Sequence, residues 1–138
     1  MKIHVYQSNK PDTTSLLRDD NGKPLPINDQ HFNLSHSGSY WAIAISDKPV
    51  GIDLQSKFKQ GNPRQLSDRV LQKILKPGEK PVRNNYIHNF VIKEAYAKLT
   101  GEGLSLGFSA IDANELLKKY HPYYEETPDY ILYAFEEK

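Results

Sequence analysis

An acidic residue in a strand-like segment is the first feature of the sequence that could do chemistry. Residues 50–55 are VGIDLQ. Side chains alternate along a strand, so Gly51, Asp53 and Gln55 lie on one side of it and place a carboxylate beside an amide. The alternative is a polar strand side that faces solvent. Gly51 weakens the interior of a strand, which indicates that another part of the molecule closely approaches its backbone.

A second carboxylate falls within the apolar stripe of a helical segment, residues 85–100, for which Gly101 is the expected C-terminal stop. The stripe consists of Ile87, Phe90, Val91 and Ala95. At about 100° per residue, Glu94 lies within this stripe and Lys98 follows one turn later on the same side. A carboxylate among core-facing residues loses hydration and needs a cation or a metal as partner. The alternative is an ordinary surface Glu–Lys pair, stabilising by about 0.3–0.5 kcal/mol.

A third segment, FNLSHSG at residues 32–38, surrounds an imidazole with two hydroxyl groups. Ser35, His36, Ser37 and accessible backbone N–H groups form a set that can hold a phosphate. The alternative is that these side chains satisfy a turn. A Ser35–His36 nucleophile–base pair is rejected, because adjacent side chains point apart and no G-x-S-x-G pattern surrounds the serine.

The two carboxylates suggest a metal site if the fold brings them together. Asp53 on a strand and Glu94 on a helix would supply hard oxygen ligands, which suit Mg²⁺.

The elements that must position these residues form a mixed pattern. Alternation and β-forming residues predict strands at residues 2–7, 40–46, 50–55, 106–111 and 130–135. Helical spacing predicts helices at residues 63–75, 85–100 and 113–120. The segments 40–46 and 50–55 flank a short turn that contains Pro49, the pattern of a β-hairpin. We expect an α+β fold, with a small antiparallel sheet packed against helices in one domain over residues 1–138. Residues 1–30 would form an N-terminal strand followed by a loop or arm.

Composition excludes several classes of function. The chain has 138 residues, with 18 Lys and Arg against 17 Asp and Glu, so its net charge of +1 argues against nucleic-acid or membrane binding by bulk charge. The absence of cysteine excludes disulfides, thiolate metal sites and a cysteine nucleophile. No apolar run approaches the roughly 18 residues of a membrane span, and the first residues lack a signal-peptide pattern. We therefore expect a cytoplasmic protein.

Taken in order, these segments resemble the 4′-phosphopantetheinyl transferase superfamily. The matching text is GKP at residues 22–24, FNLSHSG at 32–38, VGIDLQ at 50–55 and FVIKEAYAKLTGEGLS at 90–105. The resemblance covers roughly residues 22–111. The SHS segment precedes the GID segment, which is similar to the larger, surfactin-synthetase-activating type. The fold that this resemblance implies is a 4′-phosphopantetheinyl transferase-like lobe.

The resemblance also implies a reaction. Members of the family transfer 4′-phosphopantetheine from coenzyme A to a serine of an acyl or peptidyl carrier protein, use Mg²⁺ or Mn²⁺, and release 3′,5′-ADP. Carried over by motif, Asp53 and Glu94 would ligate the metal, with Gln55 as a third oxygen ligand. Glu94 would also activate the carrier serine, and Lys98 would contact the phosphates. The residues implied at the nucleotide end are Lys23, Ser35 and His36.

Two departures from the family pattern shape the expectations. Gln55 stands where the larger type usually has a glutamate, so the metal site carries less negative charge. Most of the first half of the larger type has no counterpart in the chain, so we expect a homo-oligomer that covers the exposed face. Two other hypotheses remain: a non-catalytic module that binds coenzyme A or a carrier protein, and a structural lobe that requires a separate partner chain.

Overall fold

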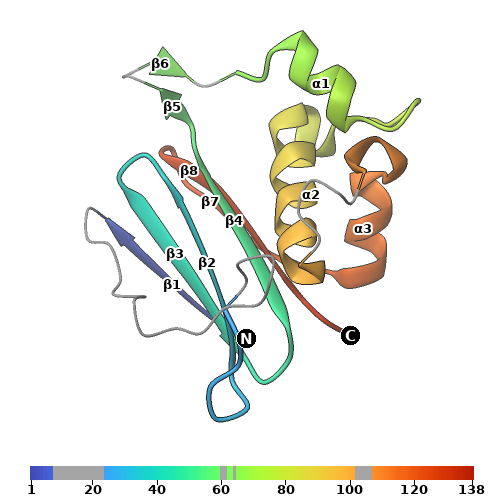
Figure 1. Cartoon of the computed structure of the whole chain (residues 1–138). Coiled ribbons are helices and arrows are strands. Elements are labelled where there is room, and N and C mark those ends of the chain that lie inside the picture. Colours follow the sequence, from blue (N-terminus) through green and yellow to red (C-terminus); the bar gives the residue numbers. More distant parts are fainter. Residues whose placement is uncertain (8–23, 60–61, 64, 102–106) are drawn as a thin grey trace.

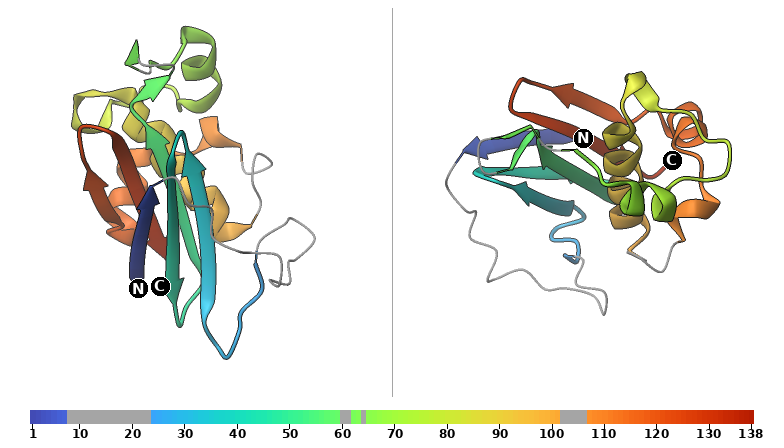
Figure 2. Two further views of the ribbon diagram at one scale, coloured as in Figure 1. Left: turned by 90° about the vertical axis from the view of Figure 1, so that its left-hand side faces the viewer. Right: turned by 90° about the horizontal axis from the view of Figure 1, so that it is seen from above.

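The computed structural model of the chain describes residues 1–7, 24–59, 62–63, 65–101 and 107–138 (Figure 1). It has an α+β fold, and two views place α2 and α3 on the same side of the strands (Figures 1 and 2). The strands are β1 (Lys2–Gln7), β2 (His31–Ser37), β3 (Tyr40–Ser46), β4 (Val50–Ser56), β5 (Phe58–Lys59), β6 (Asn62–Pro63), β7 (Tyr123–Glu126) and β8 (Tyr130–Glu136). The α-helices are α1 (Asp68–Ile74), α2 (Tyr86–Thr100) and α3 (Ala113–Tyr120), and the 3₁₀ turns are η1 (Val82–Asn84) and η3 (Phe108–Ala110).

Two three-stranded antiparallel sheets form the strand layer. Their strand orders are β1-β3-β2 and β4-β8-β7. One face of the second sheet packs on α2 and α3, where Tyr133 and Phe135 of β8 join the helices in one core cluster. The other face packs against the first sheet, where Ile52 and Leu54 of β4 meet Ala44 of β3 in a second cluster. The strand β4 is therefore buried on both faces.

Helix α2 has defined ends and lies very close to β4. The Asn85 side chain caps its first turn by accepting a hydrogen bond from Ile87 N, and Gly101 ends it in the left-handed conformation with φ of 76°. A Cβ atom added at Gly51 of β4 would lie 2.2 Å from Leu99 N and 2.3 Å from Ala95 O. The close approach expected at Gly51 is confirmed, and the approaching group is the backbone of α2.

Side chains of β2 connect the first sheet to β4. The backbone N–H groups of alternate β4 residues donate to three β2 side chains: Ile52 N to Asn33 Oδ1 (2.8 Å), Leu54 N to Ser35 Oγ (3.0 Å) and Ser56 N to Ser37 Oγ (2.9 Å). The opposite edge of β4 pairs with β8. Side-chain oxygens of the FNLSHSG segment thus satisfy backbone donors that would otherwise be buried without partners.

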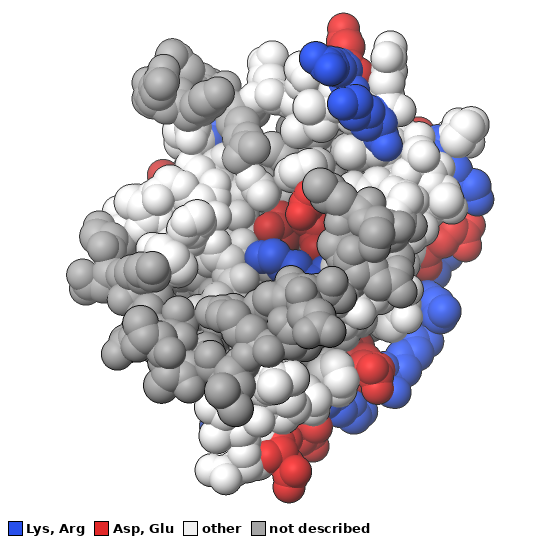
Figure 3. Space-filling view, viewed as in Figure 1, with Lys and Arg blue, Asp and Glu red and all other residues white. Residues whose placement is uncertain are grey.

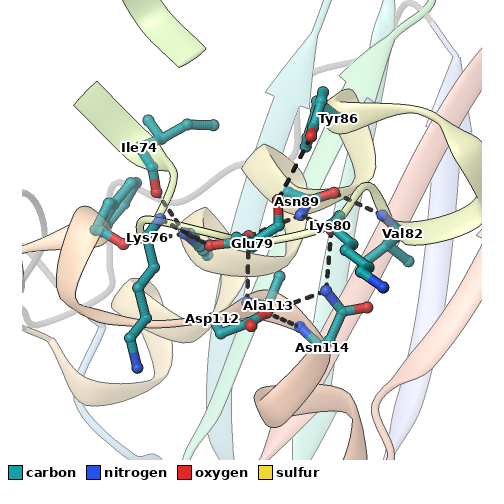
Figure 4. A network of polar contacts seen from close by, with 12 residues as sticks. Ile74, Lys76, Glu79, Lys80, Val82, Tyr86, Asn89, Asp112, Ala113 and Asn114 are labelled. Atoms are coloured by element: carbon teal, nitrogen blue, oxygen red, sulfur yellow. Dashed lines mark hydrogen bonds and ion pairs between the residues drawn. The ribbon is translucent and has the colours of Figure 1, made fainter. Parts of the chain in front are cut away.

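A network of polar contacts around Glu79, which includes a buried ion pair, joins the helical segments to one another (Figure 4). Lys93 Nζ of α2 lies 2.6 Å from Glu79 Oε1, and both side chains are almost fully buried. Lys93 also donates to the carbonyl oxygens of Ile74 and Phe108, and Asn89 donates to Glu79 Oε2 at 2.7 Å. These contacts join the end of α1, the 76–82 segment, η3 and α2 in one network.

Most predicted elements are confirmed within a few residues. The strands at residues 2–7, 40–46, 50–55 and 130–135 and the helices at 85–100 and 113–120 are present, and the fold class is α+β as expected. The helix predicted at 63–75 is shorter, because Ser67 caps its start and Pro63 lies in β6. Of the arm predicted within residues 1–30, residues 8–23 lie outside the described part of the chain.

Two predicted features are wrong. The segments 40–46 and 50–55 do not pair as a hairpin: β3 pairs with β1 and β2, and β4 pairs with β8. The hairpin fails because β8 takes one edge of β4 and side chains of β2 take the other. The strand predicted at 106–111 is replaced, over its described residues, by the 3₁₀ turn η3, since Gly107 adopts a left-handed φ of 74° that interrupts an extended chain.

The close contact between Gly51 of β4 and the backbone of α2 predicts that one added methyl group strongly lowers the stability of the fold. Gly51→Ala should destabilise the fold by about 3 kcal/mol or more, because the new Cβ overlaps backbone atoms that cannot rotate away. Gly78→Ala is the control: its Cβ meets nothing within 4 Å, so only its φ of +83° penalises alanine, by about 1–2 kcal/mol. Urea unfolding of both variants tests this, and equal losses would contradict the tight crossing.

Candidate phosphate and metal site

The crossing of α2 over β4 brings the two predicted carboxylates into one site. Asp53 of β4 is only 4% exposed and lies 3.9 Å from Lys98 Nζ of α2. Glu94 of α2 is half-buried, and its charge contributes to raising the pKa of Asp53. Lys98 Nζ also donates to the backbone carbonyl of Leu34 on β2, at 3.0 Å. Three elements therefore meet at this lysine.

Both oxygens of Asp53 accept hydrogen bonds. Ser35 Oγ donates to Oδ1 at 3.3 Å, and Gln55 Nε2 donates to Oδ2 at 3.0 Å. These contacts come from β2 and from β4 itself. These two hydrogen bonds hold the carboxylate in one orientation and partly replace the water that it loses on burial.

A hollow of about 270 Å³ opens beside this carboxylate. Its lining residues are Leu34, Ser35, His36, Trp41, Asp53 and Lys98. Figure 3 shows acidic and basic side chains side by side in a hollow between the strands and the helices. The exposed imidazole of His36 is opposite Trp41 on the neighbouring strand, with ring centroids 4.4 Å apart and the planes at 68°. The edge of one ring therefore contacts the face of the other.

Burial shifts the proton affinities of all three charged groups. It raises the pKa of Asp53 to about 7, against the opposing effect of Lys98. It also raises the pKa of Glu94, again opposed by Lys98. It lowers the pKa of Lys98, opposed by the two carboxylates. Two carboxylates share one lysine whose own charge is disfavoured by burial, so the site favours a further cation.

The donor atoms suit a hard divalent cation that keeps open coordination positions. The described residues contain no group of three or more His, Cys, Asp or Glu side chains arranged to hold a metal. Asp53 and Glu94 offer two carboxylates, and Gln55 offers an amide whose oxygen would face the metal once the amide is turned. Mg²⁺ is commonly bound by one or two carboxylates, with water and substrate phosphates completing its shell. The residues present fit that pattern.

The structure places most of the predicted site residues together. Asp53, Ser35, His36 and Lys98 line the hollow, and Gln55 and Glu94 interact with Asp53. Lys23 lies outside the described residues. The interpretation of the 51–55 side as solvent-facing is wrong, because Asp53 is buried.

The turn interpretation of the 35–37 segment is also wrong. These residues lie in β2, and the hydroxyl groups of Ser35 and Ser37 bond to the backbone of β4. The sequence analysis missed Trp41, which lines the hollow. An aromatic residue in the strand after His36 was the available signal, but only the strand register shows that the two side chains are opposite each other.

The comparisons with known proteins agree with a hollow lined by a buried carboxylate and a lysine. The model of the 4′-phosphopantetheinyl transferase superfamily matches residues 49–128, which include Asp53, Gln55, Glu94 and Lys98. The chain therefore belongs to the 4′-phosphopantetheinyl transferase superfamily.

Curated relatives carry the same family name. The 4′-phosphopantetheinyl transferase psf-1 of Bacillus pumilus is 38% identical over 99 residues, which cover 67% of this chain and 42% of the relative. The 4′-phosphopantetheinyl transferase Sfp of Bacillus subtilis is 33% identical over 107 residues, or 73% and 47% of the two chains. The 4′-phosphopantetheinyl transferase gsp of Aneurinibacillus migulanus is 29% identical over 126 residues, or 83% and 51%. The chain thus spans about half the length of the curated relatives that it matches.

Among the described helices, none is both long and apolar enough to cross a membrane.

The raised pKa of Asp53 predicts how stability depends on pH. An unfolded aspartate has a pKa of about 3.9, so between about pH 4 and pH 7 the folded state binds more protons than the unfolded state. Stability should therefore fall as the pH rises through this window. Asp53→Asn should flatten that fall, and in the presence of a chelator it should melt at a higher temperature than the wild type at pH 8.

Thermal melting followed by circular dichroism between pH 4 and pH 8 tests this expectation. The control is Asp29→Asn, which removes an exposed carboxylate and should keep the pH dependence of the wild type. A lower melting temperature of Asp53→Asn at pH 8 would contradict the predicted cost of the buried charge.

Proposed function

We propose that this lobe binds coenzyme A and a divalent metal ion and transfers 4′-phosphopantetheine to a serine of an acyl or peptidyl carrier protein, releasing 3′,5′-ADP. The observation that carries the proposal is the meeting of Asp53 and Lys98 at a hollow also lined by His36, with Glu94 close enough to act electrostatically on both charged groups. The family membership of the chain supports the same reaction.

The metal ligands in this proposal are Asp53, Glu94 and the amide oxygen of Gln55. When bound, Mg²⁺ or Mn²⁺ would neutralise charge on the pyrophosphate of coenzyme A. Gln55 adds an oxygen ligand without adding charge. The two carboxylates therefore set the net charge of the ligand set, and Lys98 beside them would turn toward phosphate oxygens once a metal compensates Asp53.

The remaining side chains would bind the substrate and move one proton. Lys98 contacts the phosphates, and His36, with Lys23, holds the nucleotide end. Glu94 accepts the proton of the carrier serine as the serine oxygen bonds to the phosphorus of the pantetheine phosphate. The bond from that phosphorus to the bridging oxygen breaks, and 3′,5′-ADP departs with the electron pair. Burial favours proton uptake by Glu94, because it raises the pKa of this carboxyl.

The transfer reaction gives a direct test of Glu94. Glu94→Gln should abolish the mass gain of an apo carrier protein incubated with coenzyme A and Mg²⁺, because it removes one ligand charge and the proton acceptor. The wild-type gain should vanish with a chelator. Intact-mass spectrometry measures both results.

Glu115→Gln is the matched control, since it makes the same chemical change on the exposed side of α3 and should leave transfer unchanged. Full transfer by Glu94→Gln would rule out its assigned role. Binding of coenzyme A without transfer to any carrier protein by the wild type would favour a non-catalytic binding module.

We also propose that the lobe acts as a homo-oligomer. The described lining of the hollow comes from β2, β3, β4 and α2 of one copy, and the hollow is open toward solvent. A second copy would cover the nucleotide from the other side. Light scattering after size exclusion, in the presence of coenzyme A and Mg²⁺, should give a multiple of 15.8 kDa. A monomer that binds coenzyme A at every concentration would contradict this.

A further inference from the structure

We propose that Ser35 is a positioning residue for the metal ligand Asp53, and that it does not contact the nucleotide. This inference rests on the proposed function in one respect, since it takes Asp53 as a ligand of the divalent metal. It revises the role that the family resemblance implies for Ser35.

The hydroxyl group of Ser35 is already fully committed as a donor. A serine hydroxyl has one hydrogen to donate and two lone pairs that accept. The hydrogen is directed to Asp53 Oδ1 at 3.3 Å, and one lone pair accepts from Leu54 N at 3.0 Å. A phosphate oxygen would require a donor, and Ser35 could supply one only by releasing Asp53. Ser35 is also 6% exposed, which leaves little surface for a ligand.

Asn33 and Ser37, the neighbours of Ser35 on the same strand face, show which of the two hydrogen bonds of Ser35 is specific to it. Asn33, Ser35 and Ser37 each accept one backbone N–H of β4, so each contributes one hydrogen bond that joins the sheets. Among the described hydrogen bonds of these three side chains, Ser35 alone also bonds to a carboxylate, that of Asp53. The contact with Asp53 is therefore additional to the connection between the strands.

That additional contact controls the direction of the carboxylate. Gln55 holds Oδ2 at 3.0 Å, and Ser35 holds Oδ1 on the side where Lys98 lies at 3.9 Å. Without the hydroxyl group, only Gln55 would hold the carboxylate, and the attraction of Lys98 would draw Oδ1 toward the lysine. Groups that hydrogen-bond a metal ligand typically change metal affinity about 10–100-fold when removed.

The experiment compares two serine variants by Mn²⁺ binding. In Ser35→Ala, electron paramagnetic resonance titration of free Mn²⁺ should show affinity weakened about 10-fold or more. Ser37→Ala, which loses the equivalent acceptor for a β4 N–H, should bind Mn²⁺ as the wild type does. Ser35→Thr keeps the hydroxyl group and should restore most of the affinity. Thermal melting confirms that each variant is folded, and Ser35→Ala should lose more stability than Ser37→Ala because it also removes a hydrogen bond to the buried Asp53.

Binding of 3′,5′-ADP without metal separates the two roles of Ser35. Its affinity should be the same in Ser35→Ala as in the wild type, and it should fall in His36→Ala. Weakened 3′,5′-ADP binding with unchanged Mn²⁺ affinity in Ser35→Ala would overturn the inference, and so would equal Mn²⁺ affinities of the Ser35→Ala and Ser37→Ala variants.

Asp53→Asn shows whether the inference or the proposed function has failed. The proposed metal site requires this variant to lose Mn²⁺ binding. If Asp53→Asn binds Mn²⁺ like the wild type, the metal site itself is wrong. If Asp53→Asn loses binding while Ser35→Ala retains it, only the positioning role is wrong.

Discussion

The close crossing of α2 over Gly51 is the contact on which the site depends. The atoms nearest to this glycine belong to Ala95 and Leu99 of α2. Glu94 and Lys98 each precede one of these residues, so the crossing places their side chains beside β4. Asp53 lies two residues after Gly51 on the same face of that strand. A helix held farther away by a larger residue would carry Glu94 and Lys98 away from Asp53.

Two lysines of α2, the buried Lys93 and the half-buried Lys98, show how the same charge serves different purposes. Lys93 lies 2.6 Å from Glu79, and backbone carbonyls complete its hydrogen bonds. Lys98 lies 3.9 Å from Asp53 and also responds to Glu94, so one cation faces two carboxylates. The first arrangement is electrostatically complete and joins the helical segments. The second is deficient in positive charge, which is a property of a site that binds cations.

The helical half of the site follows from the sequence because its signals are local. Asn85 and Gly101 mark the ends of α2, and helical spacing alone places Glu94 and Lys98 on one side. Gly51 indicates a close approach, although the sequence does not identify α2 as the neighbour. Only the family resemblance indicates that β4 and α2 lie close together. The number of residues between two elements does not give the distance between them in space.

The strand half could not be predicted in the same way, because it depends on pairing between distant segments. The short turn at Pro49 suggests a hairpin, yet β4 pairs with β8, about 80 residues later in the chain by the register of Asp53 with Tyr133. The contacts of Ser35 and Ser37 with β4 are equally invisible in the sequence, where these residues resemble a turn or a phosphate-binding loop. Asn33, Ser35 and Ser37 do alternate with the period of a strand, but the sequence does not show that their side chains bond to the backbone of β4.

The connection between β2 and β4 would couple the residues proposed to bind the nucleotide to those proposed to bind the metal. His36 lies on β2 and Asp53 on β4, and the two strands belong to different sheets. Ser35 joins them twice, through Leu54 N and through Asp53. Lys98 joins them a third time by donating to Leu34 O while facing Asp53. A shift of β2 that accompanies a ligand at His36 would therefore act directly on the orientation of the Asp53 carboxylate.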